Sequence, residues 1–245
     1  RARRPVSGWG AGQRRSHRTG HSVEFADYRA YGIGDDMRYV DWSIYSRTGR
    51  MHVKLFIDDE DLCLHLLIDG SASMGHGNPS KLRWATELAA ALSFVGLNGQ
   101  ERVSVGVVRD RLDSGVPTSR GRSRVHRIFD FLGGVRSEGK TNLNLSLANY
   151  AESIAGAGLA IVVSDLLDPT GYDKGLTALL EKGFEVHVVH VLSPEDLNPS
   201  SMGDVRLVDS ETGEARLIRV DDHAIAAYRT RFNAFIAQVE NFCSE

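Results

Sequence analysis

LCLHLLIDGSAS, residues 62–73, decides the fold of this 245-residue chain. Its apolar run, residues 62–68, ends at Asp69. A run of this kind is typical of a parallel strand that helices cover on both faces. A short loop with two hydroxyl side chains, Ser71 and Ser73, follows the strand. Open α/β sheets bind ligands at the carboxyl ends of their strands, so the stretch predicts a central strand and a site at its end.

Strand-like and helix-like stretches alternate from this strand onwards. We expect a helix that starts at Asn78-Pro79, with Asn78 as its N-cap and Pro79 in its first position. The periodicity predicts further strands at 102–108, 159–163 and 184–192, and further helices at 125–132, 141–154 and 172–182. This alternation predicts an α/β fold: a doubly wound, mostly parallel sheet in a Rossmann-like three-layer sandwich.

The two ends of the chain differ from this pattern. Residues 204–220 flank a turn at 211–213 and predict a β-hairpin, and residues 221–243 predict a terminal helix whose wide apolar face docks on the sheet layer. We expect three parts: a basic, flexible leader (1–22), a β-rich N-terminal extension (23–61) and an α/β domain (62–245) that includes the hairpin and the terminal helix.

Composition excludes several classes of protein. With 42% hydrophobic and 25% charged residues, the chain is neither disordered nor collagen-like. The leader has six arginines and no acid, whereas the remainder has 23 basic and 32 acidic residues. Such a leader suits a solvated arm, an anionic membrane surface, nucleic acid or an acidic protein patch.

The compartment is predicted from the cysteines and from hydropathy. Cys63 and Cys243 form no C-x-x-C pair, which favours reduced thiols and a cytoplasmic location. No run approaches the roughly 18 apolar residues of a membrane span. We therefore expect membrane association only through the basic leader or through parts that lie outside this chain.

Five oxygen-bearing residues stand at strand ends or helix starts. They are Asp69, Ser71, Ser73, Thr141 and Asp165. Magnesium prefers an octahedral shell of oxygens and retains several waters, so the set predicts a site for Mg²⁺ or Mn²⁺. The alternative is that each residue only caps a helix, since Ser, Thr and Asp are favoured there.

The pattern Asp-x-Ser-x-Ser, then Thr, then Asp resembles the metal-ion-dependent adhesion site (MIDAS) of von Willebrand factor A domains. The resemblance implies that the serines and threonine are direct ligands and that the aspartates bind directly or through water. Because neutral hydroxyls supply much of the shell, the cation keeps residual positive charge. We expect a non-enzymatic module that binds the Asp or Glu of a protein partner.

The upstream string at 34–42, Gly-Asp-Asp-x-Arg-x-x-Asp-Trp, resembles a bacterial group known as domain of unknown function 58. The resemblance implies a von Willebrand A-like domain with an N-terminal extension, often encoded beside a MoxR-type AAA+ ATPase. It makes that ATPase, or a client that the ATPase remodels or assembles, the expected partner. The surrounding polar residues predict either a structural ion-pair network or a partner-docking surface; they are Arg29, Asp35, Asp36, Arg38, Asp41 and Trp42.

Other functions are weaker alternatives. Residues 71–75 differ by one residue from the G-x-S-x-G turn of serine hydrolases, but no histidine is placed to reach Ser73 by sequence pattern. A metal-dependent phosphatase at the same site lacks a second Asp two residues after Asp69. The chain has no phosphate-binding loop of the G-x-x-x-x-G-K-[ST] type. Nucleic-acid binding rests on the leader alone and would depend on salt.

Overall fold

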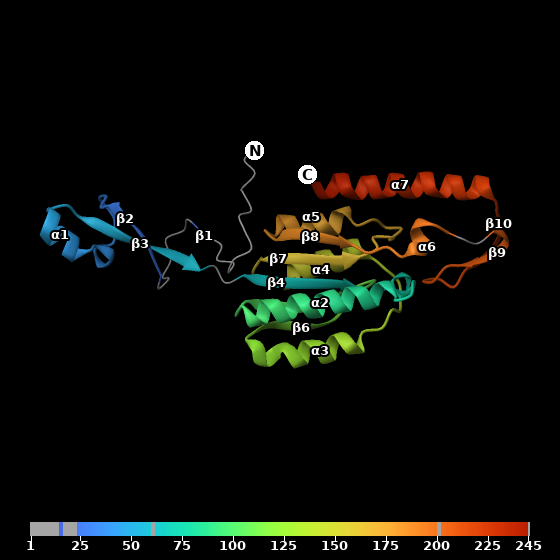
Figure 1. The fold of residues 1–245 in the computed structure, drawn as a ribbon, viewed down its shortest axis with the longest axis horizontal. Helices are drawn as coiled ribbons and strands as arrows, with labels where there is room; N and C mark the ends of the chain where they lie inside the picture. Colours follow the sequence, from blue (N-terminus) through green and yellow to red (C-terminus); the bar gives the residue numbers. More distant parts are fainter. Residues whose placement is uncertain (1–14, 17–23, 60–61, 200–201, 245) are drawn as a thin grey trace. The chain divides into compact units, whose positions relative to one another are not determined.

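A computed structural model describes residues 15–16, 24–59, 62–199 and 202–244. The chain divides into two compact units, Arg1–Asp61 and Leu62–Glu245. Each unit has its own strands and helices (Figure 1). The expected basic leader lies outside the described residues, except for Arg15–Ser16.

The first unit is a small sheet in which a helical segment connects two of the strands. Its elements are β1 (Arg15–Ser16), β2 (Glu24–Ala30), the 3₁₀ helix η1 (Met37–Tyr39), α1 (Trp42–Thr48) and β3 (His52–Asp59). The strands are ordered β1-β3-β2, and both pairs are antiparallel. Residues 37–48 are largely helical rather than extended because Asp36 and Asp41 cap two helix starts with their carboxylates.

The second unit alternates strands and helices. Its first elements are β4 (Cys63–Asp69), η2 (Ala72–Gly75), α2 (Lys81–Asn98), β5 (Arg102–Val108), β6 (Leu112–Arg120), η3 (Arg122–Arg124), α3 (Val125–Gly134) and α4 (Leu143–Ser153). The later ones are β7 (Leu159–Ser164), α5 (Asp173–Glu181), β8 (Glu185–His190), α6 (Pro194–Leu197), β9 (Gly203–Val208), β10 (Ala215–Val220) and α7 (Asp222–Ser244).

The five-stranded sheet has the order β6-β5-β4-β7-β8. The strands β5, β4, β7 and β8 are parallel, and only the edge strand β6 is antiparallel. This confirms the predicted α/β class with a mostly parallel sheet. Residues 204–220 form the predicted hairpin, with β9 and β10 antiparallel and Val205 opposite Ile218.

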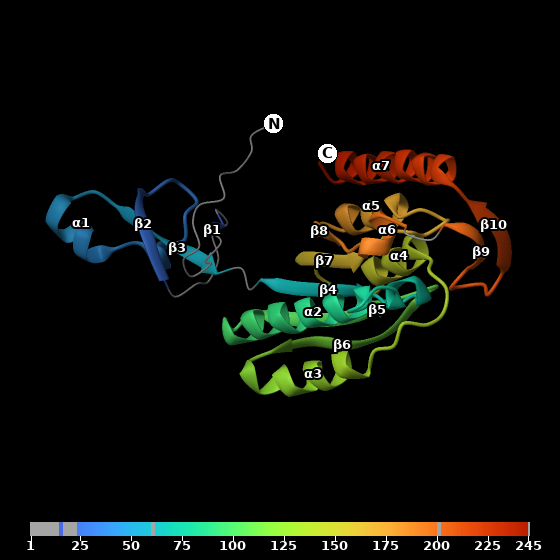
Figure 2. The same cartoon turned by 45° about the vertical axis from the view of Figure 1, so that its right-hand side comes forward.

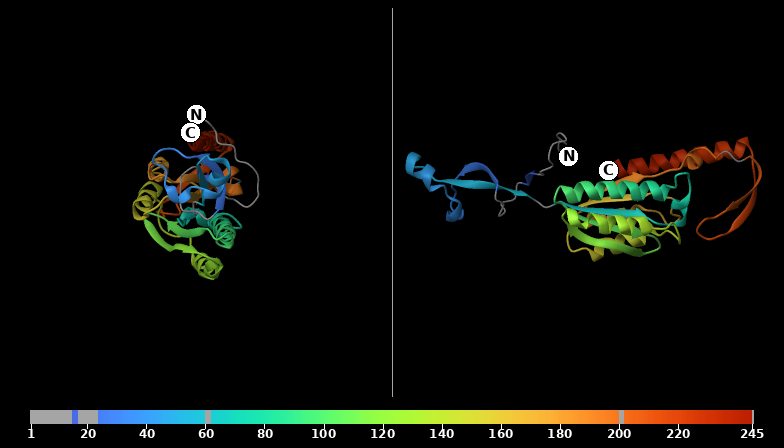
Figure 3. Two further views of the ribbon diagram at one scale, coloured as in Figure 1. Left: turned by 90° about the vertical axis from the view of Figure 1, so that its left-hand side faces the viewer. Right: turned by 60° about the horizontal axis from the view of Figure 1, so that its bottom comes forward.

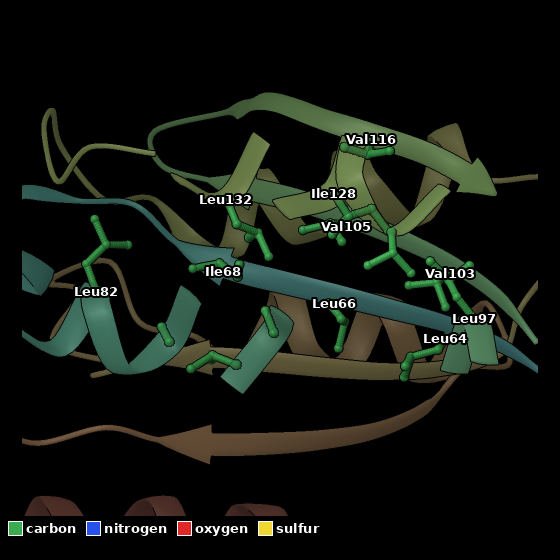
Figure 4. Packing of buried hydrophobic residues seen from close by; sticks show 14 of the residues in the cluster. Leu64, Leu66, Ile68, Leu82, Leu97, Val103, Val105, Val116, Ile128 and Leu132 are labelled. Atoms are coloured by element: carbon green, nitrogen blue, oxygen red, sulfur yellow. The ribbon is translucent and has the colours of Figure 1, made fainter. Parts of the chain in front are cut away.

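Two apolar clusters lie on the two faces of the sheet. Side chains of α2 and α3 pack with Leu64, Leu66 and Ile68 on one face (Figure 4). On the other face Leu67 packs with side chains of α4 and α5 and with Val239 of α7. Helices on both faces and an almost fully buried β4 fit a three-layer sandwich, and they explain why the strand is apolar along its length.

The start of α2 differs from the prediction. The helix begins at Lys81 with Ser80 as its N-cap, and the Ser80 hydroxyl accepts the Arg83 N–H at 3.3 Å. The Lys81 N–H donates to the His76 carbonyl, so residues 76–81 form a turn that places Asn78-Pro79 before the helix. The prediction that Asn78 is the N-cap of this helix was therefore wrong.

Candidate metal site

The predicted site lies where the order of the strands reverses. The chain passes from β4 to β5 on one side, whereas β7 pairs with the other side of β4. Asp69 is the last residue of β4, and Asp165 directly follows β7. Ligands bind open α/β sheets at such reversal points, outside the carboxyl ends of the strands.

Asp69 is fully buried and is held by two neutral donors. Its Oδ1 accepts the Ser71 N–H at 2.9 Å, and its Oδ2 accepts the Ser164 hydroxyl at 2.5 Å. Burial raises the pKa of Asp69 to about 6, and the nearby charge of Asp165 adds to this effect. Within the described ranges no basic side chain pairs with Asp69, so only neutral hydrogen-bond donors offset the charge of this carboxylate.

Hydrogen bonds join four of the five predicted residues. The Ser71 and Ser73 hydroxyls lie 3.1 Å apart, and the Ser73 hydroxyl donates to Asp165 Oδ2 at 2.9 Å. The other oxygen of Asp165 accepts the Leu167 N–H at 3.1 Å. Ser71 and Asp165 are buried, and Ser73 is half-buried.

Thr141 reaches the same sheet edge on a different loop. The Glu138 N–H donates to the Gly70 carbonyl at 3.0 Å, and the Ala72 N–H donates to the Gly139 carbonyl at 3.2 Å. These bonds set the loop before α4 beside the loop after β4. The Thr141 hydroxyl donates to Glu211 Oε1 at 2.7 Å rather than to one of the other four predicted residues.

A buried lysine that the sequence analysis missed lies in the site. Lys81 Nζ donates to Asp165 Oδ2 at 2.7 Å and to Asp196 Oδ2 at 3.1 Å, and its side chain is 3% exposed. Burial opposes its charge, but Asp165 and Asp196 raise the pKa of Lys81 above its usual value. A cation in the first turn of a helix opposes the helix dipole. The unfavourable position of Lys81 at the start of a predicted helix was the sequence signal that could have identified it.

Ser164, Glu211 and Arg109 were missed as well. Ser164, the last residue of β7, donates its hydroxyl proton to Asp69 Oδ2. Arg109 Nε donates to the Gly70 carbonyl at 3.1 Å. The same guanidinium donates to the Arg136 carbonyl at 2.8 Å through Nη2. Arg109 therefore joins the loop after β4 to the loop before α4. No local sequence pattern signals these contacts, because each joins segments far apart in the chain.

The donor set fits a hard divalent cation. Two carboxylates and three hydroxyls supply oxygen only, which suits Mg²⁺ or Mn²⁺. In the part of the chain that the structure describes, no three or more His, Cys, Asp or Glu side chains cluster as a metal site. The remaining ligands would therefore be hydroxyls and water. The charge of Asp69, which no basic side chain of the described residues pairs with, favours a cation, whereas Lys81 competes for Asp165.

The six polar residues predicted in the extension form local pairs. Arg29 pairs with Asp35 at 2.8 Å, and Arg38 pairs with Asp36 at 2.6 Å. Asp41 accepts the Ser43 and Ile44 N–H groups, the Tyr28 hydroxyl at 3.1 Å and Lys54 Nζ at 3.2 Å. The Ile44 N–H contributes most to lowering the pKa of Asp41 to about 2.

Trp42, the sixth of these residues, is 54% exposed and lies edge-on to Tyr45. All of the pairs above join residues within the first unit. Partner docking through this surface stays a prediction. The arginines of the leader, on which nucleic-acid binding rests, lie outside the described residues except Arg15.

The fold and the site define an α/β protein with an oxygen-rich candidate site at the edge of its sheet. The chain belongs to the family described as "Protein of unknown function DUF58", which matches residues 27–241. The uncharacterized protein Rv1480 of Mycobacterium tuberculosis is 30% identical over 211 residues, as is the uncharacterized protein Mb1516 of Mycobacterium bovis. Each match covers 82% of this chain and 65% of the relative.

Two solved structures are similar to the chain at low identity. The conserved hypothetical protein BatB from Bacteroides thetaiotaomicron has a TM-score of 0.47 at 18% identity, covering 75% of this chain and all of that chain. An aerotolerance-related membrane protein from Bacteroides fragilis has a TM-score of 0.45 at 16% identity, and the match covers 70% of this chain and 88% of that chain. Among the described residues of this chain, no helix is both long enough and apolar enough to cross a membrane.

Proposed function

We propose that this chain is a protein-interaction module that depends on a divalent cation. The proposal rests mainly on the set of side-chain oxygens at the ends of β4 and β7. Among them Asp69 is fully buried, and no basic side chain of the described residues pairs with it. A bound Mg²⁺ or Mn²⁺ would supply positive charge and an exchangeable position for the carboxylate of a partner. The match of five residues to the von Willebrand A pattern supports the same proposal.

The residues have separate roles in this proposal. Ser71, Ser73 and Thr141 offer hydroxyl ligands, and Asp69 and Asp165 offer charge, directly or through water. Ser164 and the Ser71 N–H orient Asp69, and Arg109 holds the loop after β4. Such positioning favours binding, because the ligands are fixed before the cation and the partner arrive.

The partner is proposed from the family resemblance. A MoxR-type AAA+ ATPase, or a client that it remodels or assembles, would offer the Asp or Glu that completes the site. We propose the cytoplasm as the location, with any membrane association through the basic leader or through parts outside this chain. The chain covers 65% of the length of the curated relatives named above, so the role of the whole protein is also a proposal.

A partner-binding assay tests this function. The native chain, Ser73→Ala and Ser123→Ala are compared for binding to the purified ATPase in one Mg²⁺ buffer, so that the ATPase's own need for Mg²⁺ is the same throughout. Ser123 is exposed and serves as the matched control. The proposal predicts at least tenfold weaker binding for Ser73→Ala alone. Equal binding by all three proteins would contradict a role for the site with this partner.

A metal-dependent hydrolase or phosphatase at the same site is the alternative. The Ser73 hydroxyl donates to Asp165 rather than to a histidine ring, and the His76 ring hydrogen-bonds to the Ser73 carbonyl oxygen at 3.1 Å instead of to its hydroxyl. A Ser-His pair needs the hydroxyl and the ring within hydrogen-bond reach. This arrangement favours binding over nucleophilic catalysis, and turnover of p-nitrophenyl phosphate that depends on Asp69 would favour the alternative instead.

A further inference from the structure

A carboxylate of the chain itself lies on one predicted metal ligand. Glu211 Oε1 accepts the Thr141 hydroxyl at 2.7 Å, and Glu211 Oε2 accepts the Thr141 N–H at 3.1 Å. The two residues are 70 positions apart, so the contact depends on the tertiary fold. A hydroxyl oxygen retains its lone pairs when it donates its proton, so this contact is compatible with coordination by Thr141.

The turn of the hairpin orients Glu211 towards the sheet edge. Asp209 Oδ1 accepts the N–H groups of Glu211 and Thr212 at 2.8 and 2.9 Å. The Gly213 N–H donates to the Asp209 carbonyl at 2.9 Å, and Gly213 has a φ of +73°, which favours glycine. The N–H groups of Thr212 and Glu211 lower the pKa of Asp209, and the positive charge of Lys140, next to Thr141, adds to this effect.

The hairpin has little other anchorage. It extends past the carboxyl ends of the parallel strands, between α6 and α7 in the chain (Figures 2 and 3). None of residues 203–220 is buried, and only Val205, Glu211 and Val220 are half-buried. Apolar side chains on both strands are open to solvent, including Leu217 at 83% and Val208 at 57% exposure.

We propose that Glu211 is an internal carboxylate that occupies Thr141, one of the proposed metal ligands, and that hairpin β9–β10 thereby closes the site against acidic groups until the hairpin is displaced. This inference rests on the proposed function, because it assigns the regulation of the same site. Glu211 accepts both the hydroxyl and the N–H of Thr141, so a partner's Asp or Glu that approaches this proposed ligand would meet the Glu211 carboxylate first. The exposed apolar side chains leave the hairpin with few contacts to lose when it moves.

Tethering explains how one carboxylate can close the site. A group held on a short segment has an effective concentration in the millimolar range or above. A weakly binding external carboxylate at lower concentration therefore competes poorly with Glu211. A partner whose acid also contacts the hairpin or the sheet edge gains the additional binding needed to displace it.

Access of an external carboxylate to the site is the quantity to measure. The full chain is loaded with Mn²⁺, and the paramagnetic relaxation of the methyl protons of acetate is recorded for the native chain, Glu211→Ala and Glu214→Gln. Glu214 lies in the same hairpin and pairs only loosely with Arg216 at 3.7 Å, so it controls for the loss of a charge. We expect at least threefold stronger acetate relaxation in Glu211→Ala only.

Hydrogen exchange of the Thr141 amide gives a second readout. In the absence of Mn²⁺, we expect roughly tenfold faster exchange of Thr141 and of residues 203–220 in Glu211→Ala, with Glu214→Gln unchanged. Unchanged exchange and unchanged acetate relaxation, with Mn²⁺ bound, would overturn the inference alone. Absence of Mn²⁺ binding by both the native chain and Glu211→Ala would overturn the proposed function and the inference together.

Discussion

Asp69 and Lys81 determine the charge balance of the site. Asp69 is fully buried with neutral donors, whereas Asp165 is neutralised by the buried ammonium of Lys81. The cost of burying a carboxylate is therefore concentrated on Asp69. Two substitutions separate these contributions.

Replacing Asp69 with Asn should stabilise the metal-free protein. The pKa of Asp69 is raised to about 6, so its stabilising contribution is present below pH 4 and is lost as the pH rises through 6. At pH 7.5 in EDTA, we expect Asp69→Asn to raise the free energy of unfolding by up to about 3 kcal/mol, because each unit of pKa shift corresponds to about 1.4 kcal/mol. The gain should vanish towards pH 4, as measured by urea unfolding at both pH values.

The same variant should lose its response to metal. Mg²⁺ should raise the melting temperature of the native chain and leave that of Asp69→Asn unchanged, because a cation that binds only the folded state stabilises it. Glu181→Gln, an exposed acid on α5, is the control and should behave as the native chain does. A native chain that is more stable than Asp69→Asn in EDTA at pH 7.5 would contradict this description of Asp69.

Replacing Lys81 with Met should have the opposite pair of effects. Without metal, Asp165 and Asp196 lose their buried cation, which should cost about 3 kcal/mol of unfolding free energy. Mg²⁺ no longer competes with an ammonium for Asp165, so its dissociation constant should fall about tenfold, or about 1.4 kcal/mol. Calorimetry against Lys174→Met, an exposed lysine on α5, checks this; weaker Mg²⁺ binding by Lys81→Met would show that Lys81 assists the metal.

Single site residues could be predicted from the sequence only where their positions relative to predicted strands and helices indicated them. Asp69 ends one strand, Ser71 and Ser73 follow it, and Asp165 follows the neighbouring strand, so the positions of the strand ends predict that these residues lie close together. Lys81 and Glu211 could not be found this way. Their partners lie 84 and 70 residues away, and no periodicity encodes such contacts.

The elements of the second unit were predicted where apolar periodicity is strong. The expected strand at 102–108 is β5 with the same bounds, and the expected helix at 172–182 is α5 within one residue at each end. Strand β6 was missed because only Val116 is buried among its described side chains and because it contains Gly115 and Pro117. An edge strand tolerates both residues.

The contact between α4 and α5 gives a prediction at the scale of the element. A Cβ on Gly175 would meet the Leu143 carbonyl oxygen at 2.7 Å and Leu147 Cβ at 3.0 Å. Gly175→Ala should therefore lower the free energy of unfolding by about 1–3 kcal/mol. Gly133 in α3 has no atom within 4 Å of the added Cβ, so Gly133→Ala should raise it by about 0.5–1 kcal/mol.

Thermal and urea unfolding of both glycine variants provide the measurement. Opposite signs are expected because the substitutions add the same methyl group to a crowded and to an open helix surface. Loss of stability in both variants would show that α3 also depends on its glycine, and gain in both would contradict the close packing of α5 on α4.

At the scale of the whole molecule, the predicted metal ligands all belong to the unit Leu62–Glu245. The order of the strands brings the ends of β4 and β7 together, and the hairpin adds Glu211 to the same edge. The first unit carries its own ion pairs and an exposed tryptophan. The predicted metal ligands and the polar residues of the extension therefore belong to different compact units of the chain.

Calorimetric titration of Mg²⁺ into the metal-stripped full chain tests the central claim most directly. Native protein and Asp69→Ala are measured side by side, with circular dichroism to confirm that the variant is folded. We predict saturable binding at one site in the native chain and its loss in the variant. Absence of binding to the native chain at millimolar Mg²⁺, or equal binding by both proteins, would contradict a metal site at the ends of β4 and β7.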